Sequence, residues 1–173
     1  MCLCVLAFSP RILAQVSVAA SVRFTATLHG HVSINTRAIP VSIPISDDNS
    51  ASNRASVPLE FNWNLNPREV QGFEVIGYFA DPNAALTGDT RHFVVPSAQV
   101  LGRWESGALR SFSETHELGT AGAGLSLFSE PVLHGHSRGS RTGVLELTID
   151  SQLASVLSRD NYRGVLYVEV RHY

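Results

Sequence analysis

Apolar and polar residues alternate in short runs along most of this chain of 173 residues. Successive side chains of a β-strand point to opposite faces, so each run predicts a strand with one buried face. Helical spacing is almost absent, and Ser151–Leu157 offers at most one short turn, with Asp150 as its N-cap. We therefore predict an all-β protein of about eight or nine strands. The runs fall at Val22–Leu28, Val32–Ile34, Ile39–Ile45, Leu59–Leu65, Phe73–Phe79, His92–Val95, Leu125–Leu127, Leu145–Ile149 and Leu166–Val170.

The chain reads as one domain. No internal repeat or shift in composition divides it, and its length suits a single core. With 44% hydrophobic and 16% charged residues, it can bury that core without a disulfide or a metal. Many short strands separated by turn residues favour a sandwich or a barrel. We predict a single β-sandwich domain over residues 15–173, after a signal peptide over residues 1–14.

The N-terminal segment predicts export. Met1–Phe8 is an apolar run that contains Cys2 and Cys4, and it is followed by Pro10 and by the small residue Ala14. This pattern resembles the end of a secretory signal peptide, and its basic n-region is missing, so we expect the start codon to lie upstream. The alternative is a first β-strand. Cleavage after Ala14 would leave a secreted, periplasmic or cell-surface protein with no cysteine and hence no disulfide.

Two prolines predict that the strand at Ile39–Ile45 lies at the edge of its sheet. Successive backbone N–H groups of a strand point to opposite edges, so Pro40, Ser42 and Pro44 share one edge. Proline has no N–H group, and two of these three donors are therefore missing. That edge cannot carry a regular hydrogen-bonded ladder.

Charge and residue types argue against several functions. The net charge of −2 gives no field that attracts nucleic acid or anionic lipid, and no apolar run is long enough for an integral membrane segment. All thirteen basic residues are arginine, which excludes lysine Schiff-base chemistry. Glu60, Glu146 and Glu169 fall on the polar phase of their strands, the ordinary solvated position for glutamate. We expect neither enzymatic activity nor a cofactor.

A His-Gly-His triplet occurs twice and is the best metal candidate. On a strand, His29 and His31 would share one face, as would His134 and His136, and two such pairs side by side could hold Zn²⁺ or Cu²⁺. Each intervening glycine suggests a turn or a bulge instead, and no carboxylate lies close by in sequence. We therefore favour solvated turn histidines and predict no metal site. A His-rich metal-binding protein is the second alternative function.

Trp104 is the candidate for ligand contact. It lies between Gly102 and Gly107, where no apolar stripe includes it, in a glycine-rich segment over residues 102–124 that we expect to form a long loop. An exposed tryptophan there could stack on a carbohydrate. A loop aromatic tucked over the end of the core is the other interpretation. A carbohydrate- or ligand-binding β-sandwich module is accordingly the first alternative function.

The C-terminal region resembles that of bacterial pilin-type or fimbrial-like secreted proteins. Arg141–Asp150 is followed, after a linker, by Asn161–Val170, an alternating strand that opens with a Tyr-x-Gly sequence. The alternating strand after the signal peptide, the segment Pro58–Leu65 and the turn Tyr78–Pro82 add to this resemblance. Two features depart from it, because the paired-cysteine bridge is absent and His172, in place of tyrosine, is the penultimate residue.

The resemblance implies an immunoglobulin-like Greek-key sandwich with a surface or assembly role and no catalytic residues. Tyr162, shortly after Leu157, also resembles a tyrosine corner, with an ordinary turn tyrosine as the alternative. We expect an exported structural or interaction protein that assembles through strand edges with itself or other surface subunits, and a periplasmic chaperone as a further partner. The expected donor strand contains Val22, Phe24, Ala26 and Leu28, and the expected receiving strand contains Leu166, Val168 and Val170.

Overall fold

The computed structural model describes residues 24–28, 37–45, 53–133 and 137–173, with side chains from Ala38 onward. This part of the chain contains eleven strands, a 3₁₀ turn and a short helix. The predicted run His92–Val95 contains β6, and the predicted run Val32–Ile34 lies outside the described residues. The strands without a predicted run are β5 and β8, which have only two or three residues, and β7, whose apolar phase is interrupted by Gly102. The elements are β1 (Phe24–Leu28), β2 (Arg37–Ile45), β3 (Arg54–Asn64), β4 (Gly72–Phe79), β5 (Leu86–Gly88), β6 (Val94–Val95), η1 (Ser97–Gln99), β7 (Val100–Trp104), β8 (Arg110–Ser111), β9 (Gly124–Pro131), β10 (Arg138–Ile149), α1 (Ser151–Ala154) and β11 (Asp160–His172).

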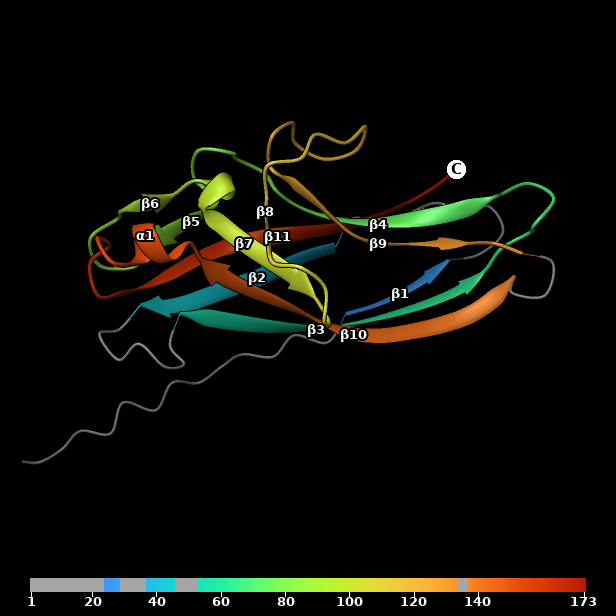
Figure 1. Ribbon diagram of the computed structural model, residues 1–173, viewed down its shortest axis with the longest axis horizontal. Coiled ribbons are helices and arrows are strands. Elements are labelled where there is room, and N and C mark those ends of the chain that lie inside the picture. Colours follow the sequence, from blue (N-terminus) through green and yellow to red (C-terminus); the bar gives the residue numbers. More distant parts are fainter. Residues whose placement is uncertain (1–23, 29–36, 46–52, 134–136) are drawn as a thin grey trace, which may run out of the picture.

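The strands form two sheets that pack face to face, so the prediction of an all-β sandwich is confirmed (Figure 1). Sheet A has the strand order β1-β3-β10-β7-β8 and is antiparallel except for the parallel pair β1–β3. Sheet B has the order β6-β5-β11-β4-β9, and β2 also pairs with β11. Leu166 of β11 pairs with Ile39 of β2 and with Phe79 of β4, so β11 is an internal strand.

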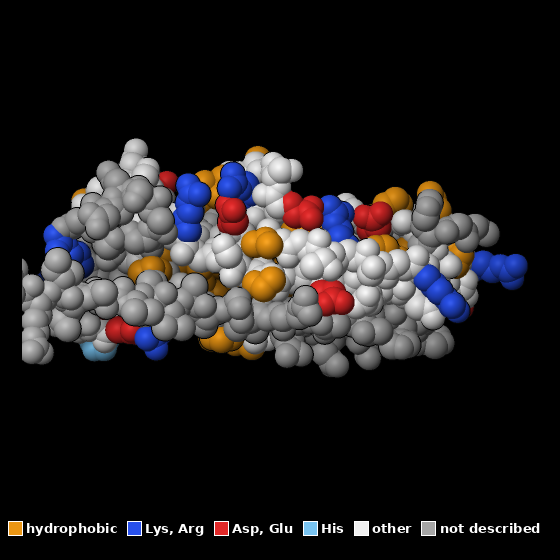
Figure 2. All heavy atoms as spheres, turned by 90° about the horizontal axis from the view of Figure 1, so that it is seen from below, with side chains coloured by type: hydrophobic (Ala, Val, Ile, Leu, Met, Phe, Trp, Pro, Cys, Tyr) orange, Lys and Arg blue, Asp and Glu red, His pale blue; other side chains and the backbone are white. Residues whose placement is uncertain are grey.

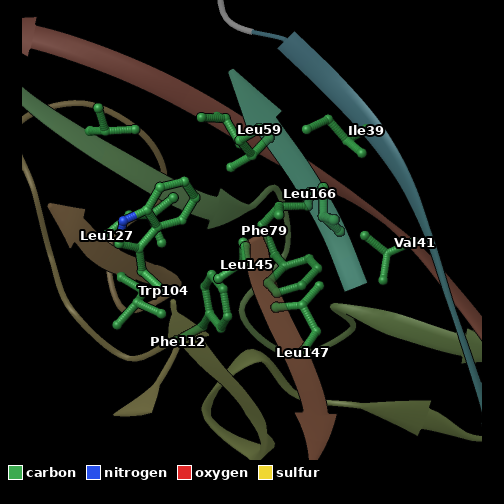
Figure 3. Packing of buried hydrophobic residues seen from close by; sticks show 14 of the residues in the cluster. Ile39, Val41, Leu59, Phe79, Trp104, Phe112, Leu127, Leu145, Leu147 and Leu166 are labelled. Carbon is green, nitrogen blue, oxygen red and sulfur yellow. The ribbon is translucent and has the colours of Figure 1, made fainter. Parts of the chain in front are cut away.

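The core lies between the sheets and is built from the apolar phase of each strand. On β2, the four aliphatic side chains at odd-numbered positions are at most 7% exposed, whereas Ala38, Pro40 and Ser42 face solvent. Figure 3 shows that Leu145 of β10 and Leu166 of β11 point toward one another across this interior. Removal of such apolar surface from water is the dominant favourable contribution to folding.

β2 is an edge strand, as its prolines predict. It pairs with β11 over its whole length, and none of the other described strands pairs with its outer side. Pro40 and Pro44 have no N–H group to donate, so the ladder to β11 uses the alternate residues. The outer edge of β2 therefore lacks two donors and is protected from further pairing.

The predicted N-cap of the short helix before β11 is confirmed. Asp150 caps α1, because its carboxylate accepts a hydrogen bond of 2.9 Å from the backbone N–H of Gln152. The Tyr162 ring is fully buried, and its hydroxyl donates to the backbone carbonyl of Ser158 at 3.2 Å. A hydrogen bond to the backbone a few residues upstream is what a tyrosine corner requires. No helix formed by the described residues is long and apolar enough to cross a membrane.

Candidate interaction edges

One half of β10 has a strand neighbour on only one side. β10 pairs with β3 from Arg138 to Thr148, but its pairing with β7 covers only Leu145–Ile149. Figure 1 shows the first half of β10 extending past the end of β7. Within the part of the chain that the structure describes, Arg138–Gly143 has no strand on the β7 side. We call this stretch the open edge of β10.

Two hydrogen bonds establish which backbone groups this edge presents. The Glu105 N–H donates to the Val144 carbonyl at 2.9 Å on the β7 side, and the Leu65 N–H donates to the Ser137 carbonyl at 2.7 Å on the β3 side. In an antiparallel ladder the N–H and C=O of one residue point the same way, and the direction alternates along the strand. The backbone groups of Arg138, Ser140 and Thr142 therefore point out from the open edge.

An arginine lies on the inner face of β10 beneath the open edge. Arg141 has its guanidinium 4.6 Å from the centre of the Phe128 ring and forms ion pairs with Glu105 at 3.2 Å and Glu130 at 3.4 Å. Its side chain is 33% exposed, so water reaches the gap between the sheets at this end. A guanidinium between two sheets is tolerated here because it is both paired and partly hydrated.

Glycines on either side of Arg141 make room for two indole rings. A Cβ atom on Gly139 would collide with atoms of the Trp63 ring, and a Cβ atom on Gly143 would collide with atoms of the Trp104 ring. Trp104 in turn stacks on Phe128, with ring centres 5.3 Å apart. The inner face of this half of β10 is thus glycine and arginine covered by aromatic rings, in place of aliphatic side chains.

β1 forms the opposite edge of the same end of sheet A. Its five residues pair in parallel with Leu59–Trp63 of β3. The described residues place no second strand beside β1. We call its outer side the open edge of β1. Figure 2, seen from the side of β3 and β10, shows acidic and basic side chains interspersed around a small apolar group, so no patch of one charge sign covers the described part of this face.

The outer edge of β9 is occupied by side chains from the segment before it. Glu114 pairs with Gly124 through two backbone hydrogen bonds of 2.9 Å, and its carboxylate accepts from the Ser126 N–H at 2.8 Å. The Ser126 carbonyl accepts from the Arg110 guanidinium, and His116 contacts the Glu114 carboxylate at 3.0 Å. Both backbone groups of Ser126 are therefore used, which blocks pairing at this point.

The strands predicted to exchange are not neighbours. Leu166, Val168 and Val170 are at most 2% exposed, and Leu166 and Val168 have strand partners on both sides. β1, which contains Phe24, Ala26 and Leu28, lies in the other sheet beside β3; Val22 is outside the described residues. Leu166 and Val168 therefore offer no edge within the subunit, whereas Glu169–His172 pairs with β4 alone among the described strands. The open edge of β10 is the one that the prediction missed.

Trp104 does not have the exposure on which its predicted ligand contact depended. It ends β7, is 8% exposed, and lies in the core beside Phe112 and Leu127 (Figure 3). Its indole N–H has no acceptor among the described residues. The sequence did contain a signal, since Val100, Gly102 and Trp104 alternate on one face, but a glycine in the middle concealed the apolar stripe. The expected loop over 102–124 is accordingly interrupted by β7 and β8.

Two other aromatic pairs lie on different faces of the sandwich, and the candidate metal ligands lie outside the described residues. Trp63 faces inward against Phe73, whereas Tyr78 stacks on Tyr167, with ring centres 5.4 Å apart, on the outer face of sheet B. The four histidines of the His-Gly-His triplets, His29, His31, His134 and His136, all lie outside the described residues. In the described ranges, no group of three or more histidine, cysteine or acidic side chains is placed to hold a metal ion.

No protein-family model matches this chain, and no curated protein is significantly similar to it in sequence.

Proposed function

We propose that the protein is an exported, non-enzymatic structural or interaction subunit, fimbrial-like or otherwise part of a surface, which assembles by strand addition. The observation that carries the proposal is the end of sheet A, where β1, β3 and the first half of β10 form a three-stranded unit whose two outer edges have no described neighbour. An edge of this kind is a template for another strand. In strand addition, main-chain hydrogen bonds supply the affinity.

The contrast with the other edges supports this proposal. β2 is protected by Pro40 and Pro44, and β9 by the side chains of Glu114 and Arg110. β6 and β8 have two residues each, which is too short for a stable ladder. Arg54–Pro58 of β3, where Pro58 lacks an N–H group, and Glu169–His172 of β11 also have a described strand on one side only. Proteins usually protect their edges against uncontrolled pairing, so unprotected edges on both sides of one three-stranded unit favour a use for them.

The immunoglobulin-like Greek-key class and the export route are part of the same proposal. The Tyr162–Ser158 hydrogen bond supports the Greek-key interpretation. The apolar N-terminal run that ends at Ala14 supports export to the periplasm or the cell surface. A periplasmic chaperone would then serve as a temporary partner that covers an open edge before assembly.

The proposal is tested by the mass of the purified full chain, measured by light scattering over a range of concentrations. A subunit gives masses that rise above the 18.7 kDa of one chain. The variant Ser140→Pro/Thr142→Pro removes two N–H groups from the open edge and keeps every backbone hydrogen bond to β3. We therefore expect it to lose assembly and to keep nearly the same melting temperature.

Ser42→Pro is the matched control, because it removes a third N–H group from the edge of β2 that already lacks two. It should assemble like the unmodified chain. A mass of one chain at every concentration would contradict self-assembly. Assembly that survives the double proline variant would contradict the assignment of the β10 edge.

A further inference from the structure

We propose that subunits join head to tail, with the open edge of β10 in one copy paired to the open edge of β1 in the next. This inference rests on the proposed function above and names the partner of its open edges as a second copy of the same chain. The result would be one continuous sheet that passes through successive subunits.

The strand directions fit this arrangement. β1 runs parallel to β3, and β3 runs antiparallel to β10, so β1 is antiparallel to β10 within one subunit. In a row of copies that keep the same orientation, β10 of one copy therefore meets β1 of the next in the antiparallel sense. Antiparallel pairing gives straight, perpendicular hydrogen bonds and is slightly more stable per residue than parallel pairing.

The two edges also match in length and in chemistry. The open edge of β10 covers the six residues Arg138–Gly143, and β1 has five residues. The β1 sequence Phe-Thr-Ala-Thr-Leu contains no charge and no proline, the residues that usually protect an edge. On β10, Ser140 and Thr142 are exposed on the outer face, and small hydroxyl side chains of this kind pair well with threonine across strands.

A symmetric contact between two β10 edges is less favourable because of Arg141. The backbone groups of the open edge belong to even-numbered residues, so an antiparallel β10–β10 pair can slide only in steps that keep these residues opposite one another. In the registers that pair most of the edge, the two copies of Arg141 lie directly or diagonally opposite each other. Like charges at these positions destabilise a strand pair. β1 brings no charge to the same place.

A head-to-tail contact has a consequence that a symmetric contact lacks. It joins two different surfaces of the chain, so each added copy again presents an open β1 edge at one side and an open β10 edge at the other. Assembly then continues as an open row of subunits unless the rotation between copies closes a ring. Two β10 edges paired with each other would stop at a dimer.

Disulfide cross-linking tests which edges meet. In chains with Cys2→Ser and Cys4→Ser, one preparation carries Ser140→Cys, and three others carry Thr25→Cys, Ala26→Cys or Thr27→Cys. A disulfide forms only where two Cα atoms lie within about 7 Å, so it reports directly opposite residues. We expect a mixture of the Ser140→Cys chain with one of the β1 chains to give a cross-linked pair. Ser140→Cys alone should give none.

The outcomes separate this inference from the proposed function. Cross-linking of Ser140→Cys with itself, in a chain that assembles, would overturn the head-to-tail arrangement and leave the structural role intact. Assembly with no cross-link between β10 and any β1 position would do the same. A chain that neither assembles nor cross-links overturns both. Thr142→Pro should abolish the cross-link when it is placed in the Ser140→Cys chain, which supplies the β10 edge, and should leave the cross-link intact when it is placed in the β1 cysteine chain, because the pairing is directional.

Discussion

The two halves of β10 belong to one strand and differ in almost every physical respect. The second half has β3 on one side and β7 on the other, and its inward side chains Leu145, Leu147 and Ile149 are at most 2% exposed. Of the described strands, only β3 lies beside the first half, whose inward positions are Gly139, Arg141 and Gly143. An enclosed strand can have an aliphatic inner face, whereas a charge between two sheets is tolerated only where it is paired or reached by water.

This difference teaches that, within the described residues, the backbone of sheet A has strand neighbours on both sides at one end of β10 and on one side at the other. At the complete end, strand neighbours satisfy the backbone and aliphatic side chains exclude water. At the open end, aromatic rings, ion pairs and glycines fill the interior, and the backbone groups of one edge remain available to a partner. The predictions below test whether the two halves really contribute differently to folding and assembly.

The largest expected effect is in the enclosed half. Leu145→Ala removes a fully buried side chain and leaves a cavity between the sheets, so the free energy of unfolding should fall by about 2–5 kcal/mol. Val144→Ala is the control at the next position, where the side chain is 41% exposed, and it should change stability by about 0.5 kcal/mol or less. Urea unfolding measures both. Equal losses for the two variants would show that this half is not the enclosed core.

A smaller loss is expected where β10 passes from one half to the other. The Cβ atom of Gly143→Ala would collide with the Trp104 ring, so the ring must move and stability should fall by about 1–3 kcal/mol. Tryptophan fluorescence should report a changed environment, because Trp104 is displaced from its stack on Phe128. Thr142→Ala, on the exposed side of the same strand, should leave both the fluorescence and the stability nearly unchanged. An unchanged spectrum for Gly143→Ala would refute the tight packing described here.

Arg141→Ala should lower the free energy of unfolding by still less. Its ion pairs involve side chains that are 33–40% exposed, and partly hydrated pairs and cation–π contacts each contribute about 1 kcal/mol or less. The loss should shrink further when salt is added, because salt screens exposed charges. A loss as large as that of Leu145→Ala, independent of salt, would mean that the first half of β10 is as much a core strand as the second.

The smallest effect on assembly at neutral pH is expected from a substitution of Asp160, at the start of β11 and far from the open edge of β10. Desolvation acts to raise the pKa of Asp160, but hydrogen bonds from the backbone N–H groups of Thr90, Arg91 and Asn161 outweigh it and lower the pKa from 3.8 to about 2. A lowered folded-state pKa stabilises the protein above pH 3.8, and this contribution is lost as the pH falls toward about 2.

Asp160→Asn should therefore flatten the loss of thermal stability in this acidic range and leave assembly at neutral pH unchanged. Thermal unfolding followed at a series of pH values measures the first effect, and light scattering measures the second. An unaltered acid profile would show that other carboxylates dominate it. Altered assembly would show that the two ends of the molecule are coupled.

Much of the strand content could be predicted from the sequence, because alternation is a local property of the chain. The inward phases of β2, β3, β10 and β11 follow from Ile39–Ile45, Leu59–Leu65, Leu145–Ile149 and Leu166–Val170 as written. Short strands such as β5 and β8 could not be predicted, since two or three residues are too few to show a period. Trp104 was misplaced for a related reason: Gly102 has no side chain to mark its face, because the Phe112 and Leu125 side chains occupy that space.

The candidate interaction edges show the limit of local reasoning. The sequence predicted assembly through strand edges, with a donor in the first strand and a receiving strand at Leu166–Val170, but Leu166 and Val168 have described strands on both sides. No pattern within Leu166–Val170 distinguishes an internal strand from an edge strand. The proline-marked strand β2 is the exception, because a missing N–H group is a chemical fact about the residue itself.

The sequence by itself determined that this chain forms strands, which face of each strand is buried, and that β2 has a protected edge. Those properties depend on side-chain type and on the two-residue period of an extended backbone. Only the tertiary structure decided that β7 covers half of β10, that Trp104 is enclosed, and that the open edges of β1 and β10 lie at one end of sheet A. Strand neighbours are chosen by contacts between distant parts of the chain, and no local pattern encodes where one strand ends beside another.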